Sequence, residues 1–378
     1  MIKIKYGLSC LSPVHVGTGT QFSHFDGVYE DKKWYVIDLE KVIQHGSDAS
    51  NLAKDMSAKD FAWVNWLRKN KIQPSDVSTY SCPCIEDPNT FSVRESFKDV
   101  YGNPYLPGSS IKGFIRTAIA WNLLKVSKNN NKTYFQDILQ TGRNPSWLAK
   151  PLEKDIFGRD PNHDIMRAIH VCDTSITNMD KIEVGLTWTY TIRSGKLVEK
   201  SVVGEGDYKT FVEWFTPSTD FILEINLDDF LFKEKCANYL GFKDTQINAL
   251  KQMHTLCNSY SHSIIEQEKT WYRKYGMDSL YDFYCELEKT QQILSEGSFL
   301  INIGWGGGWE IKTVGDLLRN ALGEDDFTTM VRQKYGVGKN PRTREVELKA
   351  PFPKTRHIGY EAGAPMWPLG WVKAERIL

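Results

Sequence analysis

The sequence lacks the features that would direct the protein out of the cytosol. It has no run of about twenty apolar residues, and its start, MIKIKYGLSC, alternates polar and apolar side chains instead of forming a secretory signal core. Its 7 cysteines are an odd number scattered over 378 residues, which does not build a disulfide framework. We therefore expect a cytoplasmic protein in a reducing compartment, with no membrane partner.

The chain also lacks net charge, because 47 lysines and arginines balance 47 aspartates and glutamates. This balance argues against a protein that binds nucleic acid with its whole surface and confines such binding to local patches. The clearest run of cations lies near the C-terminus. It comprises Arg332, Lys334, Lys339, Arg342, Arg344, Lys349, Lys354 and Arg356. Both a binding patch and a solvated charged loop fit this run.

Zinc and nucleotide signatures are missing as well. One residue separates Cys82 from Cys84, whereas zinc ribbons have wider spacings and a second pair of ligands, so we expect these cysteines in a loop between strands. The segment GWGGGW at 304–309 ends without the Gly-Lys-Ser/Thr of a Walker loop and does not have the spacing of a dinucleotide fingerprint. We expect no metal site and no cofactor.

Strand-like and helix-like patterns alternate along the chain. Period-two patterns predict strands over 2–10, 33–37, 182–192, 221–227 and 299–303. Helical spacing predicts helices over 39–45, 58–71, 111–120 and 314–322, and a helical block over 229–296. Polar or glycine-rich segments at 127–132 and 204–207 indicate loops. This order predicts an α+β fold with two domains, 1–180 and 181–378, and with helices on one face of an antiparallel sheet.

The segment 105–120, YLPGSSIKGFIRTAIA, suggests an anion site at a helix start. Pro107 and Gly108 predict a turn, after which Ser109 or Ser110 can cap the helix. Lys112 and Arg116 are four residues apart and share one face. Since amides at a helix N-terminus already favour an anion, two nearby cations would strengthen a phosphate site. Two ordinary surface charges are the alternative.

The glycine-rich segment provides a second candidate. Gly304, Gly306, Gly307 and Gly308 would leave main-chain amides open to phosphates, and Trp305 and Trp309 could stack on bases. A tight turn beside core tryptophans is the alternative.

Four segments together resemble one protein family. They are LSPVHVGTG at 11–19, PGSSIKGFIRTAI at 107–119, IFGRDPNHDIMRAIHVCD at 156–173 and GWGGGW at 304–309. Their order, the chain length and the tail PLGWVKAERIL are similar to the RAMP proteins of CRISPR systems, and among these to the type III-A Csm subunit that caps the 3′ end of the CRISPR RNA. The resemblance spans nearly the whole chain apart from 127–132 and 229–296.

The resemblance implies tandem ferredoxin-like, RRM-related domains that bind the CRISPR RNA by its backbone and support its maturation and antiviral defence. Partners would be CRISPR RNA, other Csm subunits, especially the repeated backbone subunit, and host trimming nucleases. Such binding tolerates any base, as a guide-binding subunit requires. The residues carried over for RNA binding are His15, Gly17, Gly108, Ser109, Ser110, Lys112, Gly113, Arg116, Gly304, Trp305, Gly306, Gly307 and Gly308.

Two enzymatic alternatives and one non-enzymatic alternative stay open. Related RAMP endoribonucleases often place a histidine after the first strand, so His15 could act as general acid or base on CRISPR precursor RNA without a metal. Asp26 falls where backbone subunits can carry an acidic residue that cuts target RNA with a metal ion. A pure interaction protein, in which the helix from Ile111 contacts a neighbouring subunit, is the third reading.

Overall fold

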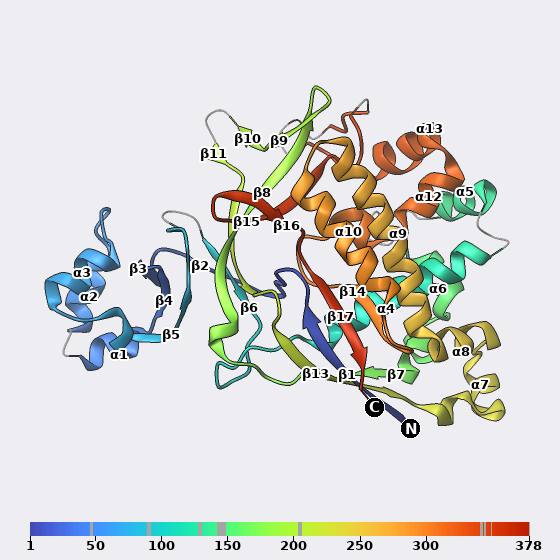
Figure 1. Ribbon diagram of the computed structural model, residues 1–378, viewed down its shortest axis with the longest axis horizontal. Coiled ribbons are helices and arrows are strands. Elements are labelled where there is room, and N and C mark those ends of the chain that lie inside the picture. Colours follow the sequence, from blue (N-terminus) through green and yellow to red (C-terminus); the bar gives the residue numbers. More distant parts are fainter. Residues whose placement is uncertain are drawn as a thin grey trace.

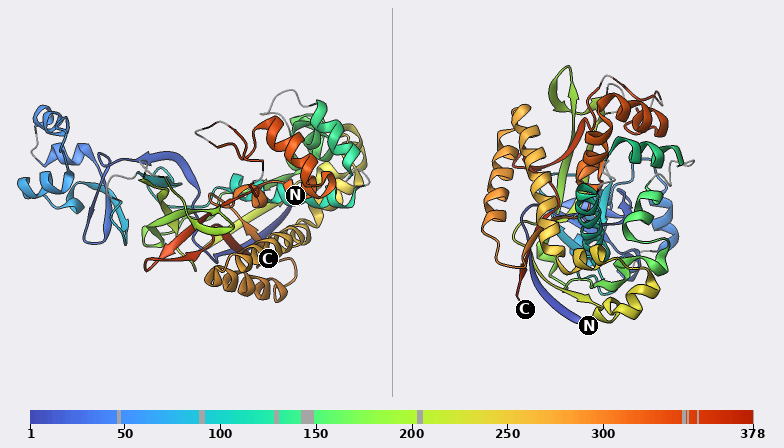
Figure 2. Two further views of the ribbon diagram at one scale, coloured as in Figure 1. Left: turned by 90° about the horizontal axis from the view of Figure 1, so that it is seen from above. Right: turned by 90° about the vertical axis from the view of Figure 1, so that its right-hand side faces the viewer.

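The computed structural model describes the chain except for residues 46–47, 89–91, 128–130, 142–148, 203–205, 341–342, 344, 349 and 378. The protein is a mixed α+β fold, as predicted. Two large sheets and the helices beside them form a body, and a smaller lobe projects from it (Figure 1; Figure 2). The predicted loops at 127–132 and 204–207 lie partly outside the described residues.

The first large sheet joins the two ends of the chain. Its strands, in spatial order, are β14 (Phe299–Asn302), β17 (Trp371–Arg376), β1 (Ile2–Cys10), β13 (Asp220–Leu227) and β7 (Ile169–Val171). All neighbours pair antiparallel, and Tyr6 lies between Leu223 and Arg376. The alternation along β1 buries Tyr6 and Leu8 and leaves Lys3 and Lys5 exposed, because successive side chains of a strand point to opposite faces.

The second large sheet carries most of the site described below. Its strands, in spatial order, are β16 (Ala364–Trp367), β15 (Thr355–Glu361), β8 (Ile182–Arg193), β12 (Lys209–Phe215), β6 (Val93–Ser96) and β2 (Gly17–Phe22), and β9 (Lys196–Glu199) also pairs with β8. Strands β12 and β6 run parallel, and the other neighbours run antiparallel. A short pair, β10 (Ser201–Val202) and β11 (Gly206–Asp207), lies beside the hairpin of β8 and β9.

The projecting lobe has a hydrophobic core of its own. It comprises β3 (Gly27–Glu30), β4 (Lys33–Ile37), β5 (Ser78–Pro83), α1 (Leu39–Gln44), α2 (Ala49–Met56) and α3 (Trp63–Asn70). Trp63, Trp66 and Leu67 on α3 pack against Val28 and Val42. Both views show this lobe standing away from the helices of the body (Figure 1; Figure 2).

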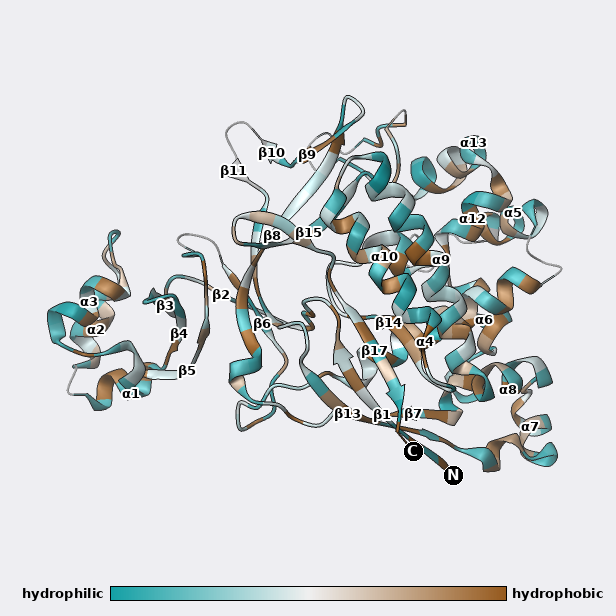
Figure 3. Ribbon diagram, viewed as in Figure 1, coloured by the Kyte–Doolittle hydropathy of each residue, from teal (hydrophilic) through white to brown (hydrophobic). Residues whose placement is uncertain are grey.

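Helix α4 lies at the centre of the helices in the body. The helices are α4 (Gly108–Val126), α5 (Lys132–Thr141), α6 (Lys150–Phe157), α7 (Glu234–Leu240), α8 (Asp244–Lys251), α9 (Met253–Lys274), α10 (Asp278–Gln292), α11 (Gly308–Lys312), α12 (Gly315–Leu322) and α13 (Glu324–Phe327). The 3₁₀ turns are Pro74–Asp76, Pro161–His163, Ile165–Ala168, Met179–Lys181 and Asp229–Phe232, and a π-helical turn spans Thr328–Gln333. On α9, the Tyr260 ring centroid lies 5.5 Å from those of Phe114 and Trp121 of α4. Hydrophobic and hydrophilic residues alternate along α9 and α10 (Figure 3), so each buries one side.

Most predicted elements exist at their predicted places, including the strands at 2–10 and 182–192 and the helical block at 229–296. The helix predicted over 58–71 begins only at Trp63, and helix α2 and strand β12 were not predicted. Strands from both sides of residue 180 pair in both large sheets; the division into domains at that residue stays a prediction. Across the described residues, no helix combines the length and apolarity needed to cross a membrane.

Candidate nucleic-acid interface

Three of the motifs singled out in the sequence meet at one groove of about 660 Å³, here called the α4 groove. Its walls come from the segment after β1, from β2 and β6, from α4, and from the glycine-rich segment with α11. The lining residues are His15, Val16, Gly17, Gly19, Thr20, Gln21, Arg94, Glu95, Ser110, Gly113, Phe114, Thr117, Gly304, Trp305, Ile311 and Lys312. Segments that lie nearly 300 residues apart in the chain (17 to 304) therefore share one surface.

The glycine-rich segment docks directly onto the segment after β1. The Trp305 amide donates to the His15 carbonyl oxygen at 2.8 Å. Gly304 has φ +75°, and a Cβ there would lie 2.1 Å from the same oxygen, so only glycine permits this approach. Gly306 (φ +103°) turns the chain again beside Leu369, and Gly307 and Gly308 lead into α11.

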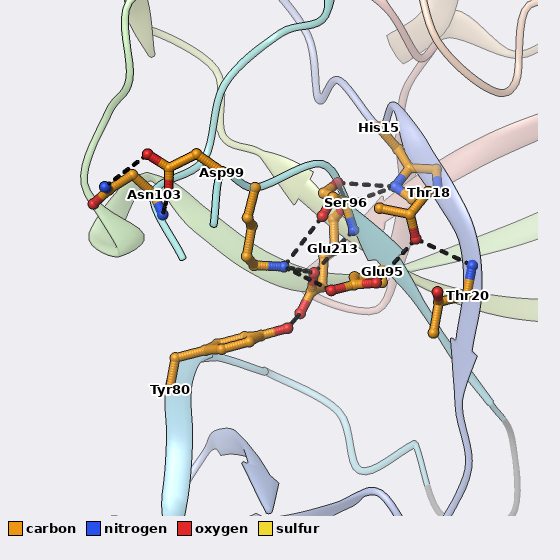
Figure 4. Close-up of polar contacts among 10 residues, drawn as sticks. His15, Thr18, Thr20, Tyr80, Glu95, Ser96, Asp99, Asn103 and Glu213 are labelled. Carbon is orange, nitrogen blue, oxygen red and sulfur yellow. Dashed lines mark hydrogen bonds and ion pairs between the residues drawn. The ribbon is translucent and has the colours of Figure 1, made fainter. Parts of the chain in front are cut away.

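His15 lies in the wall of the groove and belongs to a buried polar network. Its Nδ1 is 2.7 Å from the Glu213 carbonyl oxygen and 3.1 Å from Ser96 Oγ. A carbonyl can only accept, so Nδ1 carries the proton in the neutral ring and Nε2 is left as an acceptor. Burial lowers the pKa of His15 to about 4, which keeps the ring neutral near pH 7. Figure 4 shows Tyr80 reaching from β5 to the Glu213 carboxylate, which also pairs with Lys98 at 2.6 Å.

Trp305, which lines the α4 groove, forms an aromatic pair with His357. The Arg94 guanidinium lies 4.8 Å from the centroid of the Trp305 ring. The ring centroid of His357, a residue of β15, lies 4.4 Å from the Trp305 centroid. Trp305 is half-buried and packs against Trp214 and Leu369. Part of the Trp305 ring packs on the core and part lines the groove, and stacking on a base stays a prediction.

Lys312 places a second cation in the groove from the last turn of α11. Its Nζ donates to the Asn302 carbonyl oxygen at 3.0 Å, and the side chain is still exposed to solvent. The protein around the ammonium lowers the pKa of Lys312 to about 8 by desolvation. A phosphate in the groove would raise the pKa of Lys312 again, because a nearby anion favours the ammonium.

Helix α4 presents an uncharged face to the groove. Ser110, Gly113 and Thr117 follow at three- and four-residue spacing and line it. A Cβ added at Gly113 would meet no atom within 4 Å, so open space lies above this residue. Ser109 is exposed and does not line the groove.

The predicted serine cap of this helix is wrong. The helix begins at Gly108, its N-cap is Pro107, and no side chain of the N-cap bonds to it. Gly108 packs on the main chain of Val171 and Cys172, where a Cβ would lie 2.3 Å from the Val171 oxygen. The Asp173 carboxylate accepts from the Gly108 amide at 2.8 Å, so a protein carboxylate already bonds the first amide of the helix.

The two predicted phosphate-binding cations bond to the protein itself. Lys112 Nζ donates to the Ile169 carbonyl oxygen at 2.8 Å, and partial burial lowers its pKa. Arg116 pairs with Asp164 at 2.8 Å and Glu153 at 3.4 Å. Both stabilise the packing of α4 in this structure, and a direct contact with RNA by either stays a prediction.

Other candidates lie outside the groove. Asp26 closes a turn in which its carboxylate accepts from the Ser23 amide and hydroxyl, each at 2.7 Å. Cys82 and Cys84 are not in a loop: Cys82 lies in β5, Cys84 bridges to Val184, and both are buried. Among the described residues, no group of three or more potential ligands could hold a metal ion.

Only some of the cation run near the C-terminus gathers at one surface, where Arg332, Lys339 and Lys354 line a common pocket. Arg356 forms a buried pair with Glu268 at 2.7 Å, and Lys334 donates to the Leu139 carbonyl oxygen. Lys354 pairs with Glu347 at 2.6 Å. Arg342, Arg344 and Lys349 lie outside the described residues. Trp309 packs its ring 5.4 Å from Phe352, consistent with the core reading.

Sequence reasoning missed Arg94 and Lys312, the cations that line the α4 groove. Arg94 lies on β6, a four-residue strand too short to show a period, and Lys312 is the last residue of a helix of only five residues. The one signal for Lys312 was its closeness in sequence to the glycine-rich segment.

The α4 groove presents small residues and main chain along an open surface of a mixed α+β protein. The chain belongs to the RAMP superfamily, which matches residues 8–311. The family resemblance inferred from the motifs is therefore confirmed. The chain is also similar to one protein described as Csm5 over nearly its whole length and to a second over about half of it.

A Methanocaldococcus jannaschii protein described as CRISPR system Cms protein Csm5 is 23% identical over 399 residues, covering 96% of this chain and 86% of the relative. A Streptococcus thermophilus protein with the same description is 26% identical over 211 residues, covering 51% of this chain and 57% of that protein.

Solved structures share the fold. A chain in the cryo-EM structure of a Csm–crRNA–target RNA ternary complex of a type III-A CRISPR-Cas system superposes with a TM-score of 0.72 at 22% identity, covering 98% of this chain and all of that one. The crystal structure of T. onnurineus Csm5 gives 0.64 at 20% identity, covering 97% and 99%.

Proposed function

We propose that this protein is a CRISPR RNA-binding structural subunit of a type III-A Csm effector complex, and that the α4 groove holds the RNA backbone. One observation carries the proposal: three motifs distant in sequence line one groove beside two cations, Arg94 and Lys312. Similarity to Csm5 relatives supports the same assignment.

The groove suits a ribose-phosphate strand better than a small metabolite. Its lining combines two cations, several hydroxyl groups and glycine main chain, and one acidic side chain, Glu95, whose carboxylate accepts from Thr18 at 2.9 Å. These groups bind phosphates and 2′-hydroxyls, which are the same at every nucleotide. Trp305 offers a ring for stacking, which also tolerates any base. The groove would therefore hold guides of different sequence.

In the proposal, the predicted residues other than Ser109 divide into three groups. Gly17, Ser110, Gly113, Gly304 and Trp305 face the groove with His15 and contact RNA directly. Gly108, Lys112 and Arg116 act by holding α4 against its neighbours. Gly306, Gly307 and Gly308 shape the turn that brings Lys312 into place.

The finer assignment is part of the same proposal. We infer that the subunit caps the 3′ end of the CRISPR RNA, adjoins the repeated backbone subunit, and supports guide maturation and antiviral defence. A tandem ferredoxin-like arrangement, divided near residue 180, would suit a subunit that continues a row of related RNA-binding subunits. Host trimming nucleases are further partners under this proposal.

The decisive experiment removes the two groove cations without removing their hydrogen-bonding capacity. We expect Arg94→Gln with Lys312→Gln to weaken binding of CRISPR RNA in a filter assay. The slope of log affinity against log salt should become shallower by about 1.4, because each phosphate contact on a single strand contributes about 0.7.

A matched control removes two cations elsewhere. Lys196→Gln with Lys235→Gln changes net charge equally, and both side chains are exposed outside the groove. Equal affinity for RNA in the groove variant and the control, with both proteins folded, would refute the α4 groove as the RNA site.

A further inference from the structure

A second groove, of about 940 Å³, opens on the seven-stranded sheet; we call it the hairpin groove. One side is the end of β8 and its turn into β9, and the other is formed by residues between 332 and 355. The lining residues are Thr191, Ile192, Arg193, Ser194, Gly195, Lys200, Tyr208, Arg332, Gly338, Lys339, Asn340, Glu347, Ala350, Pro351, Phe352, Pro353, Lys354 and Thr355.

The hairpin groove is strongly cationic in a chain with no net charge. Its lining includes Arg193, Lys200, Arg332, Lys339 and Lys354 against a single carboxylate, Glu347. That carboxylate pairs with Lys354 at 2.6 Å. Within the described part of the chain, no ion pair connects the other four cations to a carboxylate. The groove therefore has several positive charges that an external anion would neutralise.

Lys200 lies beside an aromatic ring and interacts with two other cations of the hairpin groove. Its Nζ lies 3.9 Å from the centroid of the Tyr208 ring. Burial lowers the pKa of Lys200, and repulsion from Lys354 and Arg193 lowers it further. Like charges held this close favour binding of a polyanion, because phosphates relieve the repulsion.

Arg332 adds a buried charge in the wall. The side chain is only 2% exposed, and its two terminal nitrogens donate to the carbonyl oxygens of Ala350 and Glu347 at 3.1 and 3.0 Å. Its Nε has no hydrogen-bond partner. A buried guanidinium bonded to neutral carbonyls keeps its positive charge, which adds to the positive potential in the groove without direct contact with a ligand.

The two grooves lie along the same face of the sheet. Residues opposite each other in a sheet share a face, and alternate residues of one strand share it as well. Arg94 lies opposite Val212, and Val212 lies opposite Gly185 on β8. Alternation from Gly185 along β8 then puts Thr189, Thr191 and Arg193 on that face.

The aromatic pair lies between the grooves on this face. His357 lies opposite Thr189 and bonds to its hydroxyl at 3.1 Å. Arg94 of the α4 groove and Lys200 of the hairpin groove both lower the pKa of His357, although burial lowers it most, to about 4. His357 is therefore close enough to a cation of each groove for both charges to lower its pKa.

We propose that one RNA strand occupies both grooves, passing from the α4 groove over the Trp305–His357 pair into the hairpin groove. This inference rests on the proposed function and extends it to the path of the RNA. Half-exposed aromatic rings between two cationic grooves are what a single-stranded nucleic acid needs to keep its bases stacked and its phosphates paired. An acidic peptide would use the cations but not the rings.

The test compares RNA lengths in the full-length protein. Anisotropy titrations would use oligouridylates from about 4 to about 16 nucleotides, the span of typical single-strand site sizes. We expect Arg193→Ala with Lys200→Ala to weaken the longest RNA about tenfold, a loss typical of removed charged contacts. At saturation, the unaltered protein should bind two molecules of the shortest RNA, one in each groove, but only one molecule of the longest. The Arg193→Ala with Lys200→Ala variant should bind one molecule of the shortest RNA and one of the longest.

The matched control is Lys196→Ala with Lys235→Ala, since Lys196 lies on the same hairpin outside the groove. If the hairpin-groove variant binds every length like the control while Arg94→Gln with Lys312→Gln loses affinity, the path is wrong and the proposed function stands. Two long RNAs per chain would also overturn the path. If no groove variant changes RNA binding, both proposals fail. Binding of polyglutamate that is lost in Arg193→Ala with Lys200→Ala, while binding of every RNA length is unchanged in that variant, would assign the hairpin groove to an acidic protein instead.

Discussion

Two sides of helix α4 were both predicted to bind RNA, but they differ in what they contact. One side carries Lys112 and Arg116, and both bond to protein acceptors. The other carries Ser110, Gly113 and Thr117, and it opens on the α4 groove. The charged side of α4 therefore packs against the protein, and the uncharged side is open to a ligand.

The difference teaches that a cation's place near a helix start does not decide whether it faces a groove: Lys112 and Lys312 each donate to one carbonyl oxygen, but only Lys312 lines the α4 groove. A partly buried Arg–carboxylate pair has already exchanged water for a protein partner, and an incoming phosphate would have to compete with that partner. Small residues leave room for a backbone, and cations from other elements, here Arg94 and Lys312, supply the charge.

The largest effect is expected from a charge placed on the open side. Gly113→Glu should lower RNA affinity about a hundredfold, because a carboxylate facing phosphates costs several kcal/mol. Folding should be unharmed, since a Cβ at Gly113 meets nothing within 4 Å and glycine is a weak helix former. Filter binding and thermal melting of the same preparations would measure both.

Gly113→Gln is the matched control, because it adds nearly the same bulk without charge. It should lose far less affinity than Gly113→Glu. Equal affinity of Gly113→Glu and the unaltered protein would show that RNA does not approach this side of α4. The proposed difference between the two sides of the helix would then be refuted.

The next largest effect is on stability and comes from the packed side. Arg116→Ala should lower the free energy of unfolding by about 1–2 kcal/mol, as expected when charged hydrogen bonds to Asp164 and Glu153 are lost. RNA affinity of the folded protein should hardly change. Urea unfolding and anisotropy titration would separate the two quantities.

Arg116→Lys distinguishes packing from RNA contact at this position. A lysine keeps the charge but cannot donate to two carboxylates through one planar fork. Stability should therefore remain low in Arg116→Lys. Full RNA affinity in Arg116→Lys together with a large loss in Arg116→Ala would instead make Arg116 a phosphate ligand and reverse our assignment of the two sides.

A smaller effect is expected from pH. The pKa of Lys312 is lowered to about 8, so its charge is lost as pH rises above that value, well before an ordinary lysine near 10.4. RNA affinity should fall severalfold between about pH 7 and about pH 9. Lys312→Arg should remove this dependence, because a guanidinium stays charged. A dependence that persists in Lys312→Arg would exclude Lys312 as its source.

No effect is expected on RNA integrity from the histidine in the groove wall. His15→Ala should leave the length of bound CRISPR RNA unchanged on a denaturing gel, because Nδ1 bonds to a carbonyl and the ring, whose pKa burial lowers to about 4, cannot serve as an acid near pH 7. Loss of a cleavage product in His15→Ala, but not in Asp26→Ala, would establish the endoribonuclease alternative.

Local patterns predicted much of the fold. The strand at 2–10 alternates clearly because one of its faces is buried more than the other. Strand β12 escaped prediction, since its residues from Phe211 to Phe215 are all buried and show no period. Helix α2 escaped because only Leu52 and Met56 of its sequence, ASNLAKDM, are large apolar residues.

The site was predictable in its main-chain parts and not in its charges. Glycine at 304 and 306 signalled tight turns because φ is positive at both positions. The partners of Lys112 and Arg116 could not be predicted, because Ile169 and Asp164 follow them by about 50 residues and approach only when α4 packs.

The sequence by itself determined the α+β class, the long helix after Pro107, the glycine turn before α11 and the likeness to the RAMP family, because each depends on residues adjacent in the chain. Only the tertiary structure decided which cations are free to bind. A charged side chain bonds to the nearest suitable acceptor, and that acceptor usually comes from a distant segment whose position is fixed only when the sheets and helices pack.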